Sequence, residues 1–303
     1  MNRRTFTLLT TQALAATAWG AESRPSPFLS TNSYPWGTFA KRDGKPDGAH
    51  GAELLEAIQS AGIGGYEGCF DQTAEFDGLD ARLKSHQLAT RSLYINSTLH
   101  EPESARRNID RVLAIAKLGA ASGAKIVVTN PSPIRWSGPE NKTDAQLVSQ
   151  AKALDTLGAE LRELGLQLAY HNHDAELRLG GREFHHMLAA TDPGNVKFCL
   201  DAHWIYRGCG DSQVAVFDAL ELYGQRIVEL HLRQSQGGVW SEAFTGAGDI
   251  DYVRIASWLE TRKIRPHLCL EQAVEAKSPK TMDAVAAHKL SAANARLTFA
   301  AFL

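Results

Sequence analysis

Residues 166–201 read LQLAYHNHDAELRLGGREFHHMLAATDPGNVKFCLD. The stretch begins and ends with a short apolar run, Leu166–His171 and Val196–Asp201, and each run finishes on an imidazole or a carboxylate. Such runs predict strands, and the longer pattern between them predicts a helix. A strand, a helix and a second strand in this order predict two parallel neighbours, because parallel strands need a crossover connection.

The same alternation repeats along the whole chain. Eight strand candidates can be counted, at Phe28–Ser33, Gly65–Cys69, Thr90–Asn96, Lys125–Asn130, Leu166–His171, Val196–Asp201, Ile227–Leu232 and His267–Glu271. A helical pattern follows each of them, most clearly over about 103–122 and 143–164. Because no Pro/Gly/Ser-rich linker divides the chain, we expect a single closed (βα)8 barrel of the α/β class over residues 25–303. A doubly wound sheet is the alternative, disfavoured because no GxGxxG turn follows any strand.

The first 22 residues resemble an export signal. Arg3-Arg4 is followed by an uncharged, small and apolar stretch from Thr7 to Ala18, which ends in a small-x-small cleavage site. The arginine pair resembles the twin-arginine type of signal. The apolar stretch is shorter than the roughly 20 residues that a membrane-spanning helix needs. We therefore expect a periplasmic or otherwise exported protein that is not inserted in a membrane after processing.

Charge and cysteine usage exclude several classes of function. The formal net charge is −2, and the basic residues are spread along the chain, which disfavours a nucleic-acid or membrane-surface partner. A small-molecule sugar or glycoside fits better, and an oligomer remains possible. The four cysteines are widely spaced and form no CxxC motif, so we expect neither a disulfide nor a thiolate metal site. Cys199 and Cys269 fall inside strand candidates, as small apolar fillers of the barrel.

The last four strand candidates all end on residue types that ligate metals, namely His171, Asp201, His231 and Glu271. In a (βα)8 barrel the working residues lie where strands end and the following loops begin. The residues two positions earlier, on the same face of each strand, are Ala169, Cys199, Glu229 and Cys269. Two imidazoles and two carboxylates suit one divalent ion such as Mn, Co, Zn, Fe or Mg. Any one of them alone is more simply interpreted as a helix cap or an ordinary loop residue, so the prediction of a metal site depends on all four.

These motifs resemble the xylose-isomerase-like TIM-barrel superfamily, often called sugar phosphate isomerases/epimerases. The segments that carry the resemblance are Tyr170–Asp174, Leu200–Trp204, His231–Arg233, Gly246–Asp251 and Leu270–Gln272. The Tyr-His-Asn-His segment further resembles a bacterial subgroup of the superfamily that is frequently exported. The resemblance covers essentially all of the mature chain, with its specific motifs in the second half.

The resemblance implies a divalent metal, often manganese, held by a Glu, an Asp, a His and a Glu after strands five to eight. Carried over by motif, the last three ligands are Asp201, His231 and Glu271. His171 departs from the pattern, because it stands where the epimerases have a Glu that is both a ligand and a proton-transfer base. The departure puts the two-glutamate epimerisation mechanism in doubt.

Further residues are assigned roles around the metal. We expect catalytic roles for His173, His203 and Glu271 and substrate contacts for Glu67, Trp204, Arg207 and Arg233. His173 is either a general base or a helix-capping histidine, and Glu229 either orients His231 or lies in a wet part of the barrel. His203 and Arg207 are expected in a loop over the barrel mouth. Aromatic side chains suited to a sugar face are expected in loops at Trp36, Trp136, Trp204 and Trp240.

A metal at the barrel mouth chelates a carbonyl and a neighbouring hydroxyl and so promotes proton abstraction through an enediolate. The leading interpretation is a metal-dependent isomerase or epimerase acting on an unphosphorylated sugar, because phosphorylated sugars are scarce outside the cytoplasm. The first alternative is a 3-keto-glycoside 1,2-lyase, in which proton loss at C2 expels the C1 substituent by β-elimination. A sugar-binding barrel without catalytic turnover is the second alternative.

Overall fold

A computed structural model describes residues 28–46, 48, 50–136 and 138–302, and the predicted export signal lies outside these residues. Eight parallel strands form one sheet in the order β2-β1-β10-β7-β6-β5-β4-β3. Their bounds are β1 Leu29–Asn32, β2 Gly65–Glu67, β3 Ser92–Tyr94, β4 Ile126–Thr129, β5 Gln167–His171, β6 Val196–Asp201, β7 Ile227–Leu232 and β10 His267–Leu270. Parallel bridges from Gly65 to Ala89 and from Cys69 to Tyr94 join the two edge strands, so the sheet closes into the predicted (βα)8 barrel.

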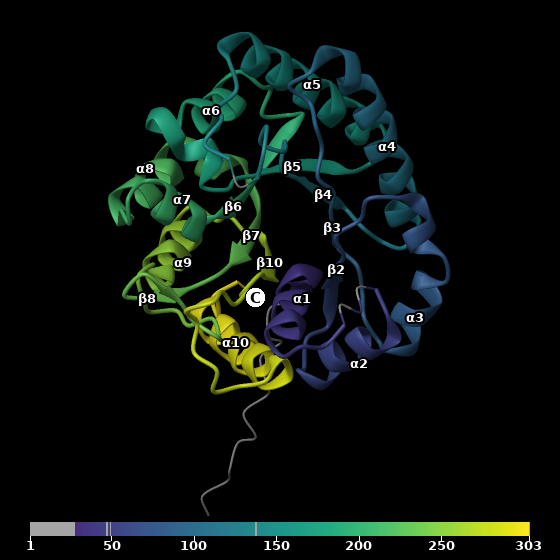
Figure 1. Ribbon diagram of the computed structural model, residues 1–303, viewed down its shortest axis with the longest axis vertical. Coiled ribbons are helices and arrows are strands. Elements are labelled where there is room, and N and C mark those ends of the chain that lie inside the picture. Colours follow the sequence, from purple (N-terminus) through teal and green to yellow (C-terminus); the bar gives the residue numbers. More distant parts are fainter. Residues whose placement is uncertain (1–27, 47, 49, 137, 303) are drawn as a thin grey trace, which may run out of the picture.

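Ten α-helices lie in the described part of the chain, and most of them form a ring around the strands (Figure 1). Their bounds are α1 Ser33–Arg42, α2 Ala52–Ser60, α3 Leu79–Ser85, α4 Pro102–Ala121, α5 Asp144–Glu163, α6 Arg178–Ala189, α7 Ala202–Gly208, α8 Gln213–Tyr223, α9 Tyr252–Thr261 and α10 Ala284–Thr298. Short 3₁₀ turns lie at Thr73–Phe76, Ala175–Leu177 and Gly224–Arg226. After β7, a small antiparallel ribbon pairs β8 (Ser235–Gln236) with β9 (Val239–Trp240).

The two clearest helical patterns of the sequence are confirmed as α4 and α5. Helix α4 begins with Pro102, whose missing N–H costs nothing in a first helical turn. Helix α5 begins with a capping box, in which the Thr143 and Gln146 side chains each bond the other residue's backbone N–H. Both helices bury one apolar face against the sheet, as amphipathic crossover helices must.

The apolar core has two compartments. A large cluster lies between the strands and the surrounding helices. A smaller cluster fills the barrel interior, and its buried members are Tyr94, Ile126, Val128, Ala169 and Cys199. Cys199 and Cys269 are fully buried, and all four cysteines are free, as expected. This small, packed floor supports the polar side chains that follow it on the same strands.

The expected loops at the barrel mouth are partly wrong. His203, Trp204 and Arg207 lie on α7, which starts directly after β6 because the Asp201 Oδ1 atom accepts a hydrogen bond from the Trp204 backbone N–H (3.0 Å). Trp36 lies on α1, which Asn32 caps in the same way, and Trp240 lies on β9. Asp and Asn are strong N-cap residues, so helices replace loops at these two strand ends.

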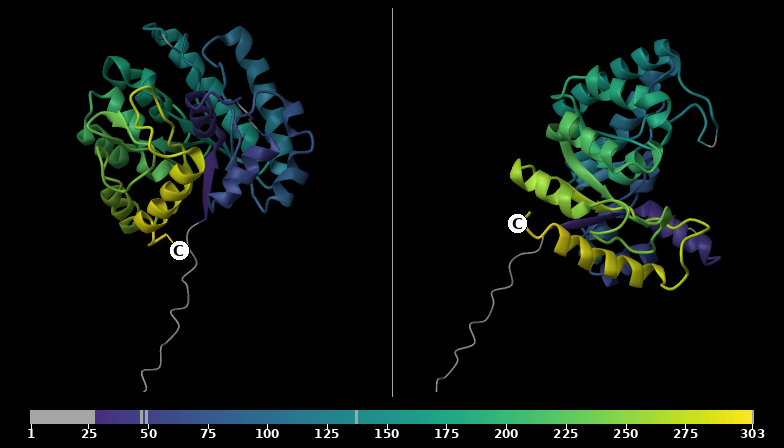
Figure 2. Two further views of the ribbon diagram at one scale, coloured as in Figure 1. Left: turned by 60° about the horizontal axis from the view of Figure 1, so that its bottom comes forward. Right: turned by 90° about the vertical axis from the view of Figure 1, so that its left-hand side faces the viewer.

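The first and last strands of the described chain are neighbours in the barrel. Strand β1 pairs with β10, and α10 packs against α1 and α2 (Figure 2). Helix α1 lies over the mouth beside the β10 strand, inside the ring of outer helices (Figure 1). None of the helices in the described segments is both long and apolar enough to cross a membrane.

Candidate active site

Three of the four expected ligands converge at the mouth of the barrel. His171 ends β5, Asp201 ends β6 and Glu271 follows β10, and all three side chains are buried. The His171 Nε2 atom lies 3.8 Å from Asp201 Oδ2 and 3.7 Å from Glu271 Oε2. All three residues lie at the carboxyl ends of barrel strands, where the active sites of this fold are found, and this shared position brings them together.

His231, the fourth expected ligand, lies between two carboxylates. Its Nδ1 atom is 3.1 Å from Glu271 Oε2, at the mouth, and its Nε2 atom is 3.0 Å from Glu67 Oε1, one layer deeper. Burial opposes a charged imidazole, but Cys199, Glu67 and Glu271 raise the pKa of His231 well above its ordinary value. The ring thus presents Nδ1 to the mouth and Nε2 to the barrel interior.

Three of the four residues fit a divalent metal, because His171, Asp201 and Glu271 each place a ligand atom within 4.8 Å of the other two. Both ring nitrogens of His171 and the Asp201 Oδ2 atom are buried, and they have no hydrogen-bond partner among the residues described. Bonds of about 2.1 Å to one ion separate neighbouring ligands by roughly 3 to 3.5 Å, close to the 3.8 and 3.7 Å that separate His171 Nε2 from Asp201 Oδ2 and Glu271 Oε2. His231 lies next to this group, with its Nδ1 atom 3.1 Å from Glu271 Oε2. Buried polar atoms are normally paired, so unpartnered nitrogen and oxygen atoms facing one another point to a bound cation.

Arg233 joins the same cluster from the segment after β7. Its Nη2 atom lies 2.8 Å from Glu271 Oε2, and its guanidinium stands 4.9 Å from the Trp204 ring centroid and 4.6 Å from that of Trp240. Burial would raise the pKa of Glu271, but Arg233 and His231 hold it well below its ordinary value. The Arg233 Nη1 atom is buried and has no partner in the described chain, which leaves it able to donate to a substrate oxygen.

A second pair of carboxyl groups lies beneath the mouth. Glu67 Oε1 accepts a hydrogen bond from Asn32 Nδ2 (2.6 Å), and Glu229 Oε1 accepts one from Ser92 Oγ (2.9 Å). Burial and the neighbouring Glu67 carboxylate raise the pKa of Glu229, whereas His231 overcomes burial and lowers the pKa of Glu67. Glu67 is completely buried and lies closer to His231 than Glu229 does, at 3.0 Å against 3.7 Å. The structure thus places Glu67 beside an expected ligand, away from the open mouth.

Aromatic and imidazole rings stand over the donor atoms. The His173 ring centroid lies 4.8 Å from that of His171, 5.2 Å from that of Trp136 and 5.3 Å from that of Trp204. Burial and His171 lower the pKa of His173 well below its ordinary value. Burial likewise lowers the pKa of His203 to about 4. Both rings are therefore neutral near pH 7, and each retains a nitrogen that accepts protons.

Two other expected positions have different surroundings. Arg207 lies 3.3 Å from Glu275 and 5.2 Å from the Trp240 ring centroid, at the outer edge of the mouth. Trp36 is buried and stacks on His288, with ring centroids 3.9 Å apart, so it packs α1 against α10.

Sequence reasoning missed two polar residues of the site. Asn32 ends β1 and hydrogen bonds Glu67, and Tyr94 ends β3 with its ring 5.4 Å from that of His171 and 6.0 Å from that of His231. The rule that picked out the last four strand ends would have found both residues, had it been applied to the first half of the barrel.

Residues 55–291 match the family model described as xylose isomerase-like TIM barrel, which is most of the chain. The chain belongs to this family. An inosose dehydratase of Clostridium perfringens is 26% identical over 179 residues, which cover 50% of this chain and 58% of that protein. The chain thus spans somewhat over half the length of this curated relative.

Solved structures agree with the xylose isomerase-like fold. A sugar phosphate isomerase/epimerase from Parabacteroides distasonis superposes with a TM-score of 0.70 at 18% identity, covering 95% of this chain and 99% of the other. The IOLI protein, solved with a bound zinc atom, superposes with a TM-score of 0.65 at 15% identity, covering 91% and 99%. At these identities the likeness concerns the fold. Together with the family match, the buried donor set makes the chain a xylose isomerase-like barrel with a candidate metal site.

Proposed function

We propose that this protein is a metal-dependent sugar isomerase or epimerase that removes a proton next to a carbonyl group of an unphosphorylated sugar. The observation that carries the proposal is the convergence of His171 Nε2, Asp201 Oδ2 and Glu271 Oε2 at the barrel mouth, where no described residue hydrogen bonds to the first two atoms. His231 Nδ1 completes the proposed ligand set from β7.

Four further side chains of the site have proposed tasks in this reaction. A divalent ion held by the four ligands would polarise the sugar carbonyl and make the neighbouring C–H group more acidic. His173, neutral and close to His171, is the proposed base that accepts the proton from carbon. Arg233 donates from Nη1 to the oxygen on which negative charge develops, and Trp204 packs along the apolar side of the guanidinium. His203 is the proposed partner that handles the second proton.

Elimination is a second candidate outcome of the same first step. Two points favour it: by the resemblance of the sequence motifs, His171 stands where the epimerases have their first glutamate, and the curated relative from Clostridium perfringens is named as a dehydratase. A 1,2-lyase acting on a 3-keto-glycoside needs one base at C2 and a leaving group at C1, and does not need a symmetric pair of bases. His173 then removes the C2 proton, and the electron pair of that C–H bond expels the C1 substituent.

We also propose that the protein belongs to the exported subgroup marked by Tyr170–His173 and reaches the periplasm by the twin-arginine route. The support is in the sequence, namely the arginine pair at residues 3 and 4 and the apolar stretch up to Ala18. Export agrees with an unphosphorylated substrate. Sequencing the amino terminus of the protein recovered from the periplasm would test this, because an uncleaved Met1 in the cytoplasm would contradict it.

One experiment separates the candidate reactions. Purified mature protein is analysed for metal and incubated in deuterated water with glucosides and their 3-keto derivatives, and the products are followed by proton NMR. Deuterium incorporation with the glycoside intact or inverted supports isomerisation or epimerisation. Exchange at C2 with release of the aglycone supports the lyase. Bound metal without exchange on any of these sugars would favour a sugar-binding barrel and overturn the enzymatic proposal.

A further inference from the structure

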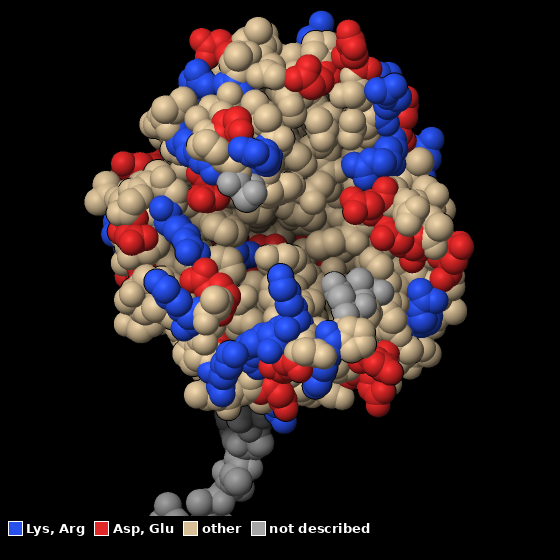
Figure 3. All heavy atoms as spheres, viewed as in Figure 1, with Lys and Arg blue, Asp and Glu red and all other residues tan. Residues whose placement is uncertain are grey.

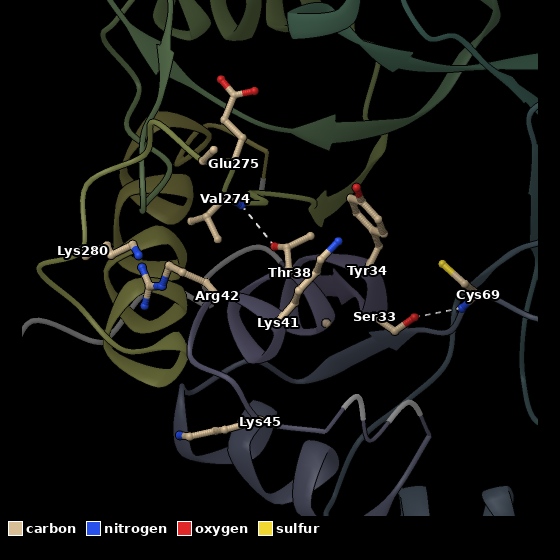
Figure 4. Close-up of a pocket in the computed structure, with 12 residues that line it drawn as sticks. Ser33, Tyr34, Thr38, Lys41, Arg42, Lys45, Cys69, Val274, Glu275 and Lys280 are labelled. Carbon is tan, nitrogen blue, oxygen red and sulfur yellow. Dashed lines mark hydrogen bonds between the residues drawn. The ribbon is translucent and has the colours of Figure 1, made fainter. Parts of the chain in front are cut away.

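A large pocket opens beside the mouth, between α1 and the segment that follows β10. Its volume is about 1060 Å³, and we call it the α1 pocket. Its lining residues are Ser33, Tyr34, Gly37, Thr38, Lys41, Arg42, Lys45, Cys69, Val274, Glu275, Ala276 and Lys280. Figure 4 shows the α1 side chains facing Val274 and Glu275 across this space.

The inner end of the α1 pocket adjoins the proposed metal site. Cys69 lines the pocket and donates from Sγ to Asn32 Oδ1 (3.3 Å), and Asn32 bonds Glu67 on its other side. Val274 follows Glu271 by three residues. Tyr34 lines the pocket with 53% of its surface exposed, which leaves its ring accessible to a ligand. A sugar at the metal therefore has room to extend toward α1.

The lining of the α1 pocket carries an excess of positive charge. Arg42 is already neutralised, because it donates to Asp43 (2.8 Å), Glu242 (2.6 Å) and the Met282 carbonyl (2.8 Å). The single lining carboxylate, Glu275, lies 3.3 Å from Arg207. Asp43 and Glu242 together exceed the charge of Arg42 by one, and Glu275 and Arg207 offset each other. With the three lysines of the lining, the region therefore keeps a net charge of about +2.

Lys41, Lys45 and Lys280 have no ion pair or hydrogen bond from their side chains to any residue in the described part of the chain. Figure 3 shows Lys and Arg atoms gathered on this part of the face, below its hollowed centre. The whole chain has a formal charge of −2, so the gathering does not reflect a basic protein. The negative end of the α1 helix dipole accounts for cations in its last turn, such as Lys41, but not for Lys280 on the opposite wall.

We propose that the α1 pocket binds an anionic group carried by the substrate, a carboxylate on the sugar or on its aglycone, with Lys41 and Lys280 as the contacts. The proposal rests on the proposed function, because it gives the substrate of that site a charge. In Figure 4 the Lys41 side chain points from α1 toward the side of the pocket where Tyr34 lies. Lysine binds anions as a compact charge on a flexible stem, which suits a substituent of variable position. The Tyr34 ring supplies an apolar wall for the carbon skeleton between the two sites.

The test uses pairs of ligands that differ only in charge. Binding of glucuronate against glucose, and of 4-carboxyphenyl glucoside against phenyl glucoside, is measured by calorimetry on the mature protein, and KM is measured on the corresponding keto derivatives. We expect the carboxylated member of at least one pair to bind about two- to fivefold more tightly, the range of an exposed charge pair, with a preference that shrinks as salt rises. Lys41→Met and Lys280→Met should remove this preference and leave the neutral member unchanged. Lys117→Met, on the exposed face of α4, is the matched control.

Each other outcome has a defined meaning. Equal binding of charged and neutral members in both pairs would overturn the proposal, and so would an equal loss for both members in the lysine variants. Binding of carboxylated ligands through Lys41 with no turnover of any sugar would reject the proposed function and keep the anion site. Tighter binding of glucose 6-phosphate than of either carboxylated ligand, lost in Lys41→Met, would keep an anion site and overturn the carboxylate assignment.

Discussion

The two carboxylate oxygens of Asp201 have different partners. Oδ1 caps α7 through the Trp204 backbone N–H, and Oδ2 faces His171 and lacks a hydrogen bond within the described residues. Asp201 therefore caps a helix with one oxygen and keeps the other available as a metal ligand. A single residue links the start of a helix to the proposed chemistry of the mouth.

Substitution at Asp201 separates the two roles. Asp201→Asn keeps an oxygen that caps α7 but removes the negative ligand, so we expect loss of stoichiometric metal and of activity with little change in unfolding free energy. Asp201→Ala should lose metal as well and destabilise the fold by a further 0.5 to 2 kcal/mol, roughly the value of an N-cap. Metal analysis and urea unfolding measure the two effects. Full metal occupancy in both Asp201→Ala and Glu271→Ala would contradict the proposed site.

Glu67 and Glu229 offer a matched pair of substitutions beneath the metal site. Glu67 is ionised and lies 3.0 Å from His231 Nε2, where it holds the ring so that Nδ1 faces the mouth. Because carboxylates that orient a ligating histidine matter nearly as much as the ligand, Glu67→Gln should weaken metal binding about 10- to 100-fold. Glu229 has a raised pKa and is already close to neutral, so Glu229→Gln should change metal affinity far less. Competition with a chromogenic chelator gives both values, and equal losses would argue against Glu67 as a positioning residue.

At the scale of an element, α5 is held against the start of β6 by the absence of a side chain. A Cβ atom at Gly158 would lie 2.3 Å from the Asn195 backbone oxygen, which cannot move without shifting the segment that leads into β6. Alanine usually stabilises a helix by about 0.5 to 1 kcal/mol relative to glycine. The steric conflict outweighs that gain, so Gly158→Ala should destabilise the protein by about 1 to 3 kcal/mol.

The control for this prediction lies on the same helix. Lys152 is exposed on α5, and Lys152→Ala should leave the unfolding free energy unchanged within about 0.5 kcal/mol. Chemical denaturation of both variants measures the difference. An increase in stability for Gly158→Ala would show that α5 can move away from Asn195.

The contact between α1 and α10 contains a histidine that is buried in its neutral form. His288 Nδ1 donates to the Ala284 carbonyl (2.8 Å), and its Nε2 atom is buried without a hydrogen-bond partner in the described chain. Burial lowers the pKa of His288 from 6.5 to about 4. Above pH 6.5 the ring is neutral in both the folded and the unfolded states, so it contributes no pH dependence. Between pH 6.5 and about 4 only the unfolded state takes up the proton, so stability falls as the pH is lowered.

The loss due to His288 should reach on the order of 3 kcal/mol at the acid end of that range. His288→Phe retains an aromatic ring against Trp36 and removes the titration, so its unfolding free energy should fall less steeply from pH 7 to pH 4.5. Part of the slope will remain, because burial also lowers the pKa of His267 to about 4. If the unfolding free energies of the wild-type protein and of His288→Phe fell with the same slope, His288 would not be the source of the acid destabilisation.

At the scale of the whole molecule, the barrel brings the proposed ligands together only when it is folded and closed. A metal that binds the native state and not the unfolded chain stabilises the protein by about 2.7 kcal/mol at a free concentration 100 times its Kd. We therefore expect a chelator to lower the midpoint of thermal unfolding and added Mn²⁺ or Zn²⁺ to restore it. Asp201→Asn should show neither effect, and a midpoint in the wild-type protein that does not respond to metal would contradict the site.

The sequence by itself determined the eight strands, the barrel and the four candidate ligands, because strand periodicity and the position of a residue at a strand end are local properties. Tertiary structure alone decided the partners of those ligands. Closure of the barrel places Glu67, which Asn32 holds by a hydrogen bond, beside His231, more than 160 residues later in the chain. It also sets Arg233 against Glu271 and creates the α1 pocket between α1 and the segment after β10. Such contacts depend on how twisted strands meet around a ring, and no pattern of spacing within one segment encodes that meeting.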